Sequence, residues 1–341
     1  MESIDWQNLP FDYFKTDYNI RRAFRGGIWE DEEVSQSETI NIHMAATCLH
    51  YGQEAFEGLK AFRCPDGKVR LFRAEANAER LQTSSRGLVM PTVPTEMFCD
   101  MAAKVVRLNA RYIPPYETGA AFYIRPLLIG MSPHLGVRPA DDYLLVMFGG
   151  PIGPYYRGGF AANPYVIIRD YDRAAPLGTG RFKVGGNYAG SLLPNQWAHE
   201  QGYAGEIYLD AKEKRFIDEC GAANFFGIKA DTYVTPESSS ILPSITNDSL
   251  MQIAADWGMK VERRPIELDE LGTFSEAGAC GTGAFISPIQ RIDDPERGTS
   301  YTYCHDGQPG PVSTALYHHL RNIQYGIEPD THHWTRIIEE V

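Results

Sequence analysis

Short apolar runs separated by turn residues dominate the first half of the chain. Apolar runs, partly alternating with polar positions, predict strands over 39–49, 54–63, 68–72, 120–130 and 143–148, with turns at Gly52 and at Cys64-Pro65-Asp66-Gly67. Apolar residues instead recur on one face over 75–89 and from Met97 to Leu108, which predicts two helices, the second capped by Thr95.

Glycine and proline are densest over 149–159, which reads Gly-Gly-Pro-Ile-Gly-Pro-Tyr-Tyr-Arg-Gly-Gly. Such a composition disfavours long regular structure and is typical of a linker. A chain of 341 residues is also long for a single core. We therefore expect an N-terminal domain over 1–148, a linker over 149–160 and a C-terminal domain over 161–341.

Strands and helices alternate again in the second half. We expect strands at 165–169, 206–209, 216–218, 224–228 and 232–234. Helices are expected at 191–201, ended by Gly202, at 248–257, capped by Thr246 or Asn247 and closed by Gly258, and at 312–325. Because both halves mix the two element types, the pattern predicts a two-domain α/β (α+β mixed) fold.

Composition excludes several classes of function. A net charge of −12 and the lack of a basic run argue against nucleic-acid binding, which relies on clustered lysine and arginine. No run of about eighteen apolar residues and no leader-like N-terminus occurs, so neither a membrane span nor a secretory signal is expected. The six cysteines form no Cys-x-x-Cys pair, which suits reduced thiols in a cytoplasmic protein, and no metal site is expected.

Lys183 carries the clearest chemical signal, because it lies in Gly178-Thr179-Gly180-Arg181-Phe182-Lys183-Val184-Gly185-Gly186-Asn187-Tyr188. Glycines let the backbone approach a flat ligand, and a partly desolvated amine becomes a nucleophile for carbonyls. These are the needs of a Schiff-base lysine that holds pyridoxal 5′-phosphate. The alternative is a flexible turn that carries a solvated lysine.

Such a cofactor also needs a carboxylate beside its ring nitrogen and a cup for its phosphate. Glu219 ends an apolar strand and precedes small residues, although a strand-end acid in a turn is the alternative. Leu242-Pro243-Ser244-Ile245-Thr246 leads into a helix N-terminus, and Gly281-Thr282-Gly283 offers further backbone N–H groups. Arg80 on the predicted helix is a candidate charged partner of the phosphate. A plain helix cap, a plain turn and a solvated arginine are the alternatives.

Aromatic residues and one arginine suggest a substrate pocket. Tyr188, five residues after Lys183, is a candidate donor to the phenolate oxygen of the cofactor. Arg125 lies inside the apolar string Phe122-Tyr123-Ile124-Arg125-Pro126-Leu127 and needs an anionic partner, either a substrate carboxylate or a structural acid. The first half is rich in aromatic residues that line either a pocket or the core: Tyr51, Phe56, Tyr123 and Tyr155.

In this order along the chain, the motifs resemble those of the branched-chain amino acid aminotransferases, which are fold type IV pyridoxal-phosphate enzymes. The resemblance covers roughly residues 11–300. The matching strings are Leu49-His50-Tyr51-Gly52, Phe56-Glu57-Gly58-Leu59-Lys60-Ala61-Phe62, Tyr123-Ile124-Arg125-Pro126, Gly150-Pro151-Ile152-Gly153-Pro154-Tyr155, Lys183-Val184-Gly185-Gly186-Asn187-Tyr188, Glu219 with Gly221 and Asn224, Leu242-Pro243-Ser244-Ile245-Thr246, and Gly281-Thr282-Gly283.

The resemblance implies a small N-terminal α/β domain, a larger pseudo-barrel domain and a role for each candidate residue. Lys183 would bind the cofactor covalently and act as the base, Glu219 would hold the ring nitrogen, and Tyr188 would bond the phenolate. The phosphate would be bound by Arg80, Ile245, Thr246 and Thr282. The substrate carboxylate would be held by Thr282, Gly283 and, from a neighbouring subunit, Tyr51. Phe56, Tyr123 and Tyr155 would line the side-chain pocket, and Arg125 would meet the distal carboxylate of glutamate.

The implied reaction is reversible transamination between L-leucine, L-isoleucine or L-valine and 2-oxoglutarate, by a homodimer or larger homo-oligomer. The sequence departs from the family pattern near the phosphate, with Ser244 in place of a common glycine and Asn247 in place of a common arginine. Two other fold type IV activities remain alternatives, D-amino acid aminotransferase and aminodeoxychorismate lyase. A non-catalytic cofactor-binding protein is the third.

Overall fold

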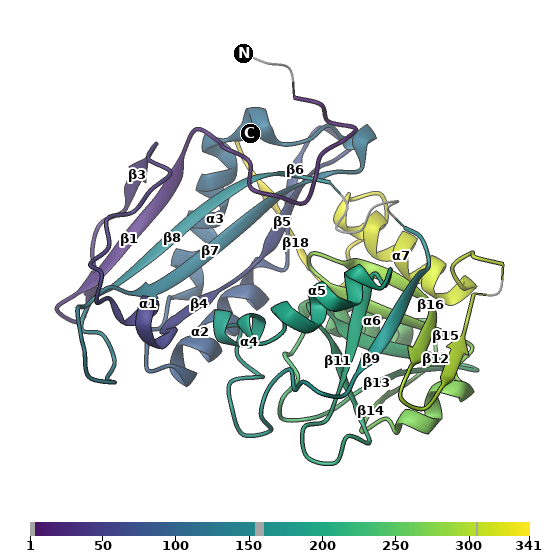
Figure 1. The fold of residues 1–341 in the computed structure, drawn as a ribbon. Helices are drawn as coiled ribbons and strands as arrows, with labels where there is room; N and C mark the ends of the chain where they lie inside the picture. The colour runs from purple at the N-terminus through teal and green to yellow at the C-terminus, as the bar shows by residue number, and fades with distance from the viewer. Residues whose placement is uncertain (1–3, 154–159, 305) are drawn as a thin grey trace. The chain divides into compact units, whose positions relative to one another are not determined.

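The computed structural model describes residues 4–153, 160–304 and 306–341, and the chain forms two compact units (Figure 1). The first unit comprises Met1–Pro154, Phe182–Gly185 and Asn322–Val341, and the second comprises Tyr155–Arg181 and Gly186–Arg321. Residues 182–185 and 322–341 thus lie in the first unit, although they fall in the range expected for the C-terminal domain. The expected linker falls largely on residues outside the described part, so its position stays a prediction.

An antiparallel sheet of nine strands forms the centre of the described part of the first unit. Seven strands run in the order β18-β6-β5-β7-β8-β1-β2, while β3 pairs with β1 and β4 pairs with β7. Their bounds are β1 (Asn19–Arg25), β2 (Ile28–Trp29), β3 (Glu33–Ser35), β4 (Glu54–Phe56), β5 (Leu59–Arg63), β6 (Val69–Phe72), β7 (Ala121–Gly130), β8 (Tyr143–Ile152) and β18 (Thr335–Ile338).

Helices α2 (Ala74–Gly87) and α3 (Thr95–Leu108) pack against each other, and α3 packs on β7 and β8 (Figure 1). Their buried positions, such as Leu81, Phe98 and Val105, join the strand side chains in one apolar core. The expected cap at Thr95 is wrong: α3 begins at Thr95, Pro94 is the cap position, and the Thr95 hydroxyl accepts a hydrogen bond from Gln82. Short 3-10 turns η1 (Ala110–Tyr112) and η2 (Tyr116–Thr118) lead into β7.

Residues 39–49 were expected to form a strand, and this prediction is wrong. The segment ends in the short helix α1 (Thr47–Tyr51), which Gly52 closes at a φ of 60°. Met44 and Leu49, which contributed to the apolar pattern, are 81% and 59% exposed and join no core. The expected strand over 54–63 is divided into β4 and β5 at Glu57 and Gly58.

Strand β8 runs four residues past its predicted end, into the glycine-rich segment that we expected to be irregular. Gly149, Gly150, Pro151 and Ile152 pair with Ile124 to Ala121 of β7, whereas β1 pairs with β8 only as far as Met147. A Cβ on Gly153 would lie 2.0 Å from the Leu9 carbonyl oxygen. These glycines therefore let the N-terminal segment pack closely, which local composition cannot reveal.

The second unit contains a mixed sheet of nine strands among its described residues. The order is β11-β10-β9-β16-β15-β12-β13-β14, with β17 paired to β16. The bounds are β9 (Asn163–Ile168), β10 (Gly205–Leu209), β11 (Ile217–Cys220), β12 (Asn224–Lys229), β13 (Thr232–Thr235), β14 (Lys260–Arg263), β15 (Glu276–Gly281), β16 (Phe285–Asp294) and β17 (Thr299–Thr302), with the turn η3 (Leu268–Thr273) before β15. Strands expected at 165–169, 206–209, 216–218, 224–228 and 232–234 are confirmed within a few residues.

The remaining helices are α4 (Gly185–Ala189), α5 (Leu192–Glu200), α6 (Ile245–Asp256) and α7 (Pro311–Gln324). The three longer ones match the predicted helices, and Gly202 and Gly258 follow α5 and α6 with positive φ, as expected. The expected cap at Thr246 or Asn247 is wrong, because α6 begins at Ile245 and Ser244 caps it by accepting the Asn247 N–H at 3.2 Å. No helix in the described ranges is long and apolar enough to span a membrane.

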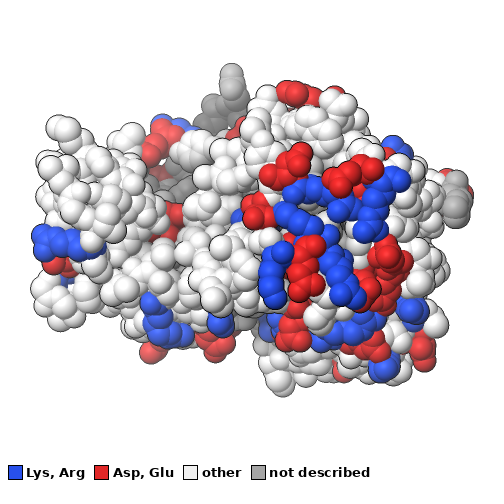
Figure 2. Space-filling view, turned by 60° about the horizontal axis from the view of Figure 1, so that its bottom comes forward, with Lys and Arg blue, Asp and Glu red and all other residues white. Residues whose placement is uncertain are grey.

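Charged side chains of both signs intermingle on the face shown in Figure 2. The same mixing occurs in single ion pairs: Arg264 pairs with Glu262 at 2.8 Å and with Glu270 at 2.6 Å. Positive charges on this face are therefore interrupted by carboxylates, whereas a nucleic-acid site needs clustered positive charge.

Candidate active site

The backbone around Lys183 is tied to the first unit by three hydrogen bonds. The Lys183 N–H donates to Ser84 Oγ at 2.8 Å, and the Phe56 N–H donates to the Lys183 carbonyl oxygen at 3.1 Å. The Gly185 N–H donates to the Glu54 carboxylate. The lysine segment is thus fixed on both sides of its side chain, which contradicts the alternative of a loose turn.

Two cations flank the ring of Phe56. Lys183 Nζ lies 4.6 Å from the ring centroid, and the Arg125 guanidinium carbon lies 4.9 Å from it. Arg125 also donates to the Tyr123 hydroxyl at 3.1 Å, while its buried Nε has no hydrogen-bond partner within the described part of the chain. The structure therefore brings Lys183, Phe56, Tyr123 and Arg125 together, and one guanidinium donor remains available for an anion.

A cavity of about 280 Å³ in the first unit is lined by Tyr123 and Arg125. The N-terminal segment Phe11–Phe14 forms another part of its wall, and the rings of Phe11 and Tyr123 meet edge to face at 5.4 Å. Sequence reasoning missed Phe11, because the three aromatic residues of this N-terminal segment follow no periodic pattern and give no positional signal. The missing side chain of Gly58 makes room for Tyr123, since a Cβ there would lie 1.9 Å from its hydroxyl oxygen.

Arg80, expected at the phosphate, forms a two-pronged ion pair with the fully buried Glu57. Its Nε donates to Glu57 Oε1 at 2.8 Å and a terminal nitrogen donates to Oε2 at 2.7 Å. Glu57 also accepts from Asn77 at 2.8 Å. This arrangement fixes the guanidinium in place, and its charge is partly balanced within the first unit.

Tyr51 ends α1, and its hydroxyl donates to the carbonyl oxygen of Leu135. The residue is 37% exposed. Its hydroxyl thus contacts the loop between β7 and β8, whereas Lys183 and Arg125 both contact the ring of Phe56. Tyr155 lies outside the described residues.

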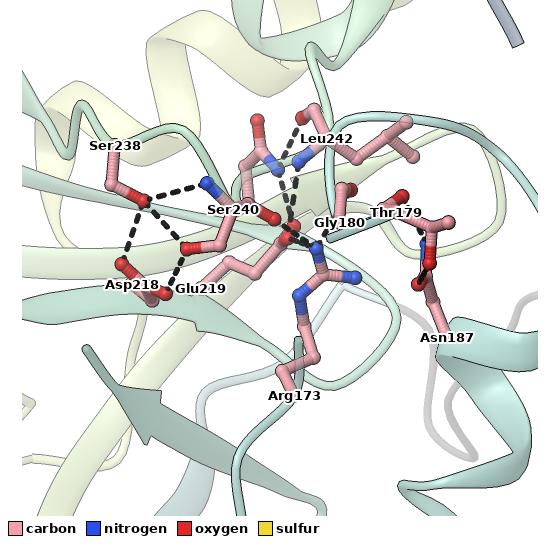
Figure 3. A network of polar contacts seen from close by, with 10 residues as sticks. Arg173, Thr179, Gly180, Asn187, Asp218, Glu219, Ser238, Ser240 and Leu242 are labelled. Carbon is pink, nitrogen blue, oxygen red and sulfur yellow. Dashed lines mark hydrogen bonds and ion pairs between the residues drawn. The ribbon is translucent and has the colours of Figure 1, made fainter. Parts of the chain in front are cut away.

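In the second unit, Glu219 lies at the centre of a buried polar network (Figure 3). Its carboxylate contacts Arg173 at 2.5 Å and accepts hydrogen bonds from Asn224 Nδ2 at 2.9 Å and from the Leu242 N–H at 3.1 Å. Burial raises the pKa of the Glu219 carboxyl to about 7, against the opposing effect of the Arg173 guanidinium. A buried carboxyl with this pKa readily shares a proton with a basic nitrogen.

Arg173 is a residue that sequence reasoning missed. Besides Glu219, it donates to the carbonyl oxygens of Gly180, at 2.9 Å, and Ser240 (Figure 3). Asp218, the neighbour of Glu219, accepts from the hydroxyls of Ser238 and Ser240. Arg173 therefore ties the loop that precedes Lys183 to the carboxylate, and only its partners, far away in the sequence, distinguish it from a solvated arginine.

Gly221, two positions after Glu219, packs against a buried side chain. A Cβ at this position would lie 2.0 Å from Glu206 Oε1, so the glycine makes room for a second buried carboxylate. Asn195 donates to Glu206 at 2.9 Å. The position of the Glu206 carboxylate therefore explains why a glycine is needed here.

The predicted phosphate cup is a well-formed helix N-terminus. Ser244 caps α6, and Ile245 and Thr246 are its first two residues, so their backbone N–H groups lie at the positive end of the helix. Asn247, the second departure from the family pattern, is buried and accepts from the Tyr233 hydroxyl at 2.8 Å while it donates to Thr235 Oγ1 at 2.9 Å. Its side chain therefore stabilises the core below the helix.

Thr282 and Gly283 lie in the half-buried turn that joins β15 to β16. Gly281 pairs with Phe285 to close this hairpin, and a Cβ on Gly281 would lie 3.6 Å from the Ala222 carbonyl oxygen. The turn is therefore adjacent to the loop that follows Glu219, and α6 packs against β15. Tyr188 lies in α4, where its carbonyl oxygen accepts from Ser191.

Comparison with known proteins shows which family the chain resembles. The model of the family "Amino-transferase class IV" matches residues 54–292. The chain belongs to the class IV aminotransferases. Among its relatives, the branched-chain-amino-acid aminotransferase of Haemophilus influenzae is 46% identical over 96% of each chain. That of Helicobacter pylori is 45% identical over 98% of each.

Solved class IV aminotransferases share the fold. The Escherichia coli branched-chain amino acid aminotransferase matches with a TM-score of 0.81 at 26% identity, over 95% of this chain and all of the other. A second branched-chain amino acid aminotransferase, complexed with N-(5′-phosphopyridoxyl)-L-glutamate, matches with a TM-score of 0.79 at 25% identity, over 96% and 100%. The predicted fold type IV architecture of mixed α/β sheets is therefore confirmed.

The residues present fit a pyridoxal phosphate group. The first unit holds a half-buried amine at Lys183 and a fixed arginine at Arg80. The second unit holds a buried carboxyl with a raised pKa at Glu219, and a capped helix N-terminus for an anion. Each set is described within its own unit, and both suit the chemical needs of such a cofactor.

Proposed function

We propose that this protein transfers the amino group reversibly between L-leucine, L-isoleucine or L-valine and 2-oxoglutarate, with pyridoxal 5′-phosphate bound at Lys183. The observation that carries the proposal is the pair of cations at the Phe56 ring, one of which, Arg125, has a buried donor without a partner in the described structure. An aromatic wall suits an aliphatic side chain, and the guanidinium suits the second carboxylate of glutamate. One pocket thus serves both substrates of the exchange.

When bound, pyridoxal phosphate supplies an aldehyde that exchanges amines and a conjugated ring that withdraws electrons from the substrate Cα. Lys183 Nζ moves the proton at that Cα. The three backbone hydrogen bonds of its segment fix the position from which the lysine side chain extends. Glu219 holds a proton against the ring nitrogen, with its position fixed by Arg173, Asn224 and the Leu242 N–H.

The remaining contacts bind and orient. Arg80, the N–H groups of Ile245 and Thr246, and Thr282 would hold the phosphate, and the Tyr188 hydroxyl would donate to the phenolate oxygen. Thr282 and Gly283 would hold the substrate carboxylate, together with Tyr51 from a neighbouring subunit. Phe56, Tyr123 and Tyr155 would line the side-chain pocket. The homodimeric state and a cytoplasmic location stay predictions from the sequence.

A substrate panel tests the proposal. The purified protein is expected to be yellow and to transaminate L-leucine, L-isoleucine and L-valine with 2-oxoglutarate, but not D-alanine. Lys183→Ala should abolish both the colour and the activity, while Lys212→Ala, which alters an exposed lysine, should retain both. A colourless wild-type protein, or one that prefers D-alanine, would show the proposal to be wrong.

A further inference from the structure

Several charged side chains share one face of the first sheet with Phe56. Phe56 pairs with Leu127 and Glu54 pairs with Ile129, so both strand residues face the same side as Arg125. Lys60 pairs with Tyr123 and joins this face, where desolvation lowers the pKa of its amine to about 8. Lys183 adds a third positive charge above the Phe56 ring. Glu54 contributes a negative charge to this cationic surface.

Glu54 interacts electrostatically with both Lys183 and Arg125. Its carboxylate accepts the Gly185 N–H, and a Cβ on Gly185 would lie 2.4 Å from Glu54 Oε1. Burial raises the pKa of the Glu54 carboxyl, while the Gly185 N–H, Arg125 and Lys183 act in the opposite direction. On α1, burial raises the pKa of the Cys48 thiol, and the negative charge of Glu54 adds a smaller effect in the same direction. The Glu54 carboxylate is thus bonded to the backbone that follows Lys183 and interacts electrostatically with both Lys183 and Arg125.

We propose that Glu54 is a specificity-determining residue. While an aliphatic substrate occupies the pocket, Glu54 balances the charge of Arg125. When a dicarboxylic substrate binds, its distal carboxylate balances the charge of Arg125 in place of Glu54. The proposal rests on the transamination proposed above. An aliphatic side chain offers no charge, so the guanidinium beside it needs a partner within the protein. A dicarboxylic substrate brings a second negative charge, which Glu54 opposes while it is ionised.

Proton uptake follows directly from this exchange. When the distal carboxylate binds, like-charge repulsion raises the proton affinity of Glu54, so the complex takes up a fraction of one proton from solution. An aliphatic monocarboxylate leaves Glu54 ionised and causes no such uptake. Affinity for the dicarboxylate, relative to the monocarboxylate, should therefore rise as the pH falls towards the pKa of Glu54.

Calorimetric titration of the loaded enzyme with glutarate and with 4-methylpentanoate measures this difference. Titrations in buffers of different ionisation enthalpy give the protons taken up with each ligand. Both carry one carboxylate at the same end, so subtraction isolates the effect of the second. The wild type is expected to take up more protons with glutarate than with 4-methylpentanoate, and equal uptake would overturn the proposal without the need for any variant.

Glu54→Gln keeps the shape of the side chain and removes its charge. Its ratio of glutarate affinity to 4-methylpentanoate affinity is expected to rise about five- to tenfold, and its extra proton uptake should disappear. Glu79→Gln on α2 removes one exposed charge from the same unit and should behave like the wild type.

An unchanged affinity ratio in Glu54→Gln, with both ligands weakened equally, would reduce Glu54 to a support for the Lys183 segment and overturn the proposal. Turnover of L-leucine by the wild type separates the two hypotheses. If the wild type transaminates L-leucine and the ratio is unchanged, only the role of Glu54 fails. If the wild type does not transaminate L-leucine, the proposed function itself is wrong.

Discussion

Arg173 and Glu219 form a buried ion pair, with 2.5 Å between guanidinium nitrogen and carboxylate oxygen and about 4% of each side chain exposed. The pair links the loop before Lys183 to the end of β11. Desolvation outweighs the attraction, because the pKa of the Glu219 carboxyl is still raised to about 7. Such a pair is costly to break from one side, since the remaining charge stays buried.

Arg173→Met should therefore lower the free energy of unfolding by about 3–5 kcal/mol near pH 8. Removal of the guanidinium raises the folded-state pKa of Glu219 further above its unfolded value. Below the unfolded-state pKa, Glu219 is protonated in both states, so its contribution to the stability of the variant is fully present. As the pH rises through the folded-state pKa, the buried carboxyl ionises and that contribution is lost. The deficit should accordingly shrink on going from about pH 8 to pH 5. Urea unfolding at both pH values measures it, and Arg263→Met, at an exposed position of the same unit, is the control.

Glu219→Gln tests the carboxylate directly. The amide still accepts a hydrogen bond but cannot share a proton with a ring nitrogen, so turnover should fall about 10²- to 10⁴-fold. Affinity for pyridoxal phosphate should fall as well, and a fluorescence titration of the apo-protein measures this without reliance on activity. Turnover within a factor of about two of the wild type would contradict the role given to Glu219.

Gly185→Ala and Gly186→Ala form a matched pair of neighbours in α4. A Cβ on Gly185 would meet the Glu54 carboxylate at 2.4 Å, whereas nothing lies within 4 Å of a Cβ on Gly186. Gly185→Ala should cost about 1–3 kcal/mol of stability and reduce kcat/KM, because the Lys183 segment must shift. Gly186→Ala should be neutral or slightly stabilising. Equal effects in urea unfolding would mean that Glu54 does not confine this backbone.

Ser244→Ala removes the cap of α6 and should cost about 0.5–2 kcal/mol. Ser244→Asp restores a cap but adds a negative charge where the phosphate is proposed to bind. The Asp variant should therefore match the wild type in urea unfolding yet bind pyridoxal phosphate more weakly than the Ala variant does. The reverse order of affinities would argue against a phosphate at this helix end.

The local pattern was enough to predict many elements and, with the family resemblance, to nominate the candidate residues. Helices α2, α5 and α7 and the strands from β9 to β13 agree with predictions from periodicity and turn residues. Lys183, Phe56, Tyr123 and Arg125 were all nominated, and the structure brings them together in one unit. The roles of the nominated residues towards cofactor and substrate stay predictions.

Two of the features that the sequence did not predict share a physical cause: the contact that determines each of them involves a residue far away in the sequence. Arg173 matters through Glu219, 46 positions later, and Gly153 is required by the backbone of Leu9. The cap of α6 was misplaced by two or three residues because Ser244, Thr246 and Asn247 are all good cap types. Only the geometry of the Asn247 N–H selects Ser244.

The path of the chain between the two units has a consequence for its synthesis. Strand β18, at residues 335–338, pairs with β6 to complete the edge of the first sheet, and residues 182–185 also belong to that unit. When the ribosome has made the first 154 residues, the first unit still lacks both pieces. Its folding is completed only after the whole of the second unit has emerged, so a truncated chain leaves β6 as an open edge that invites aggregation.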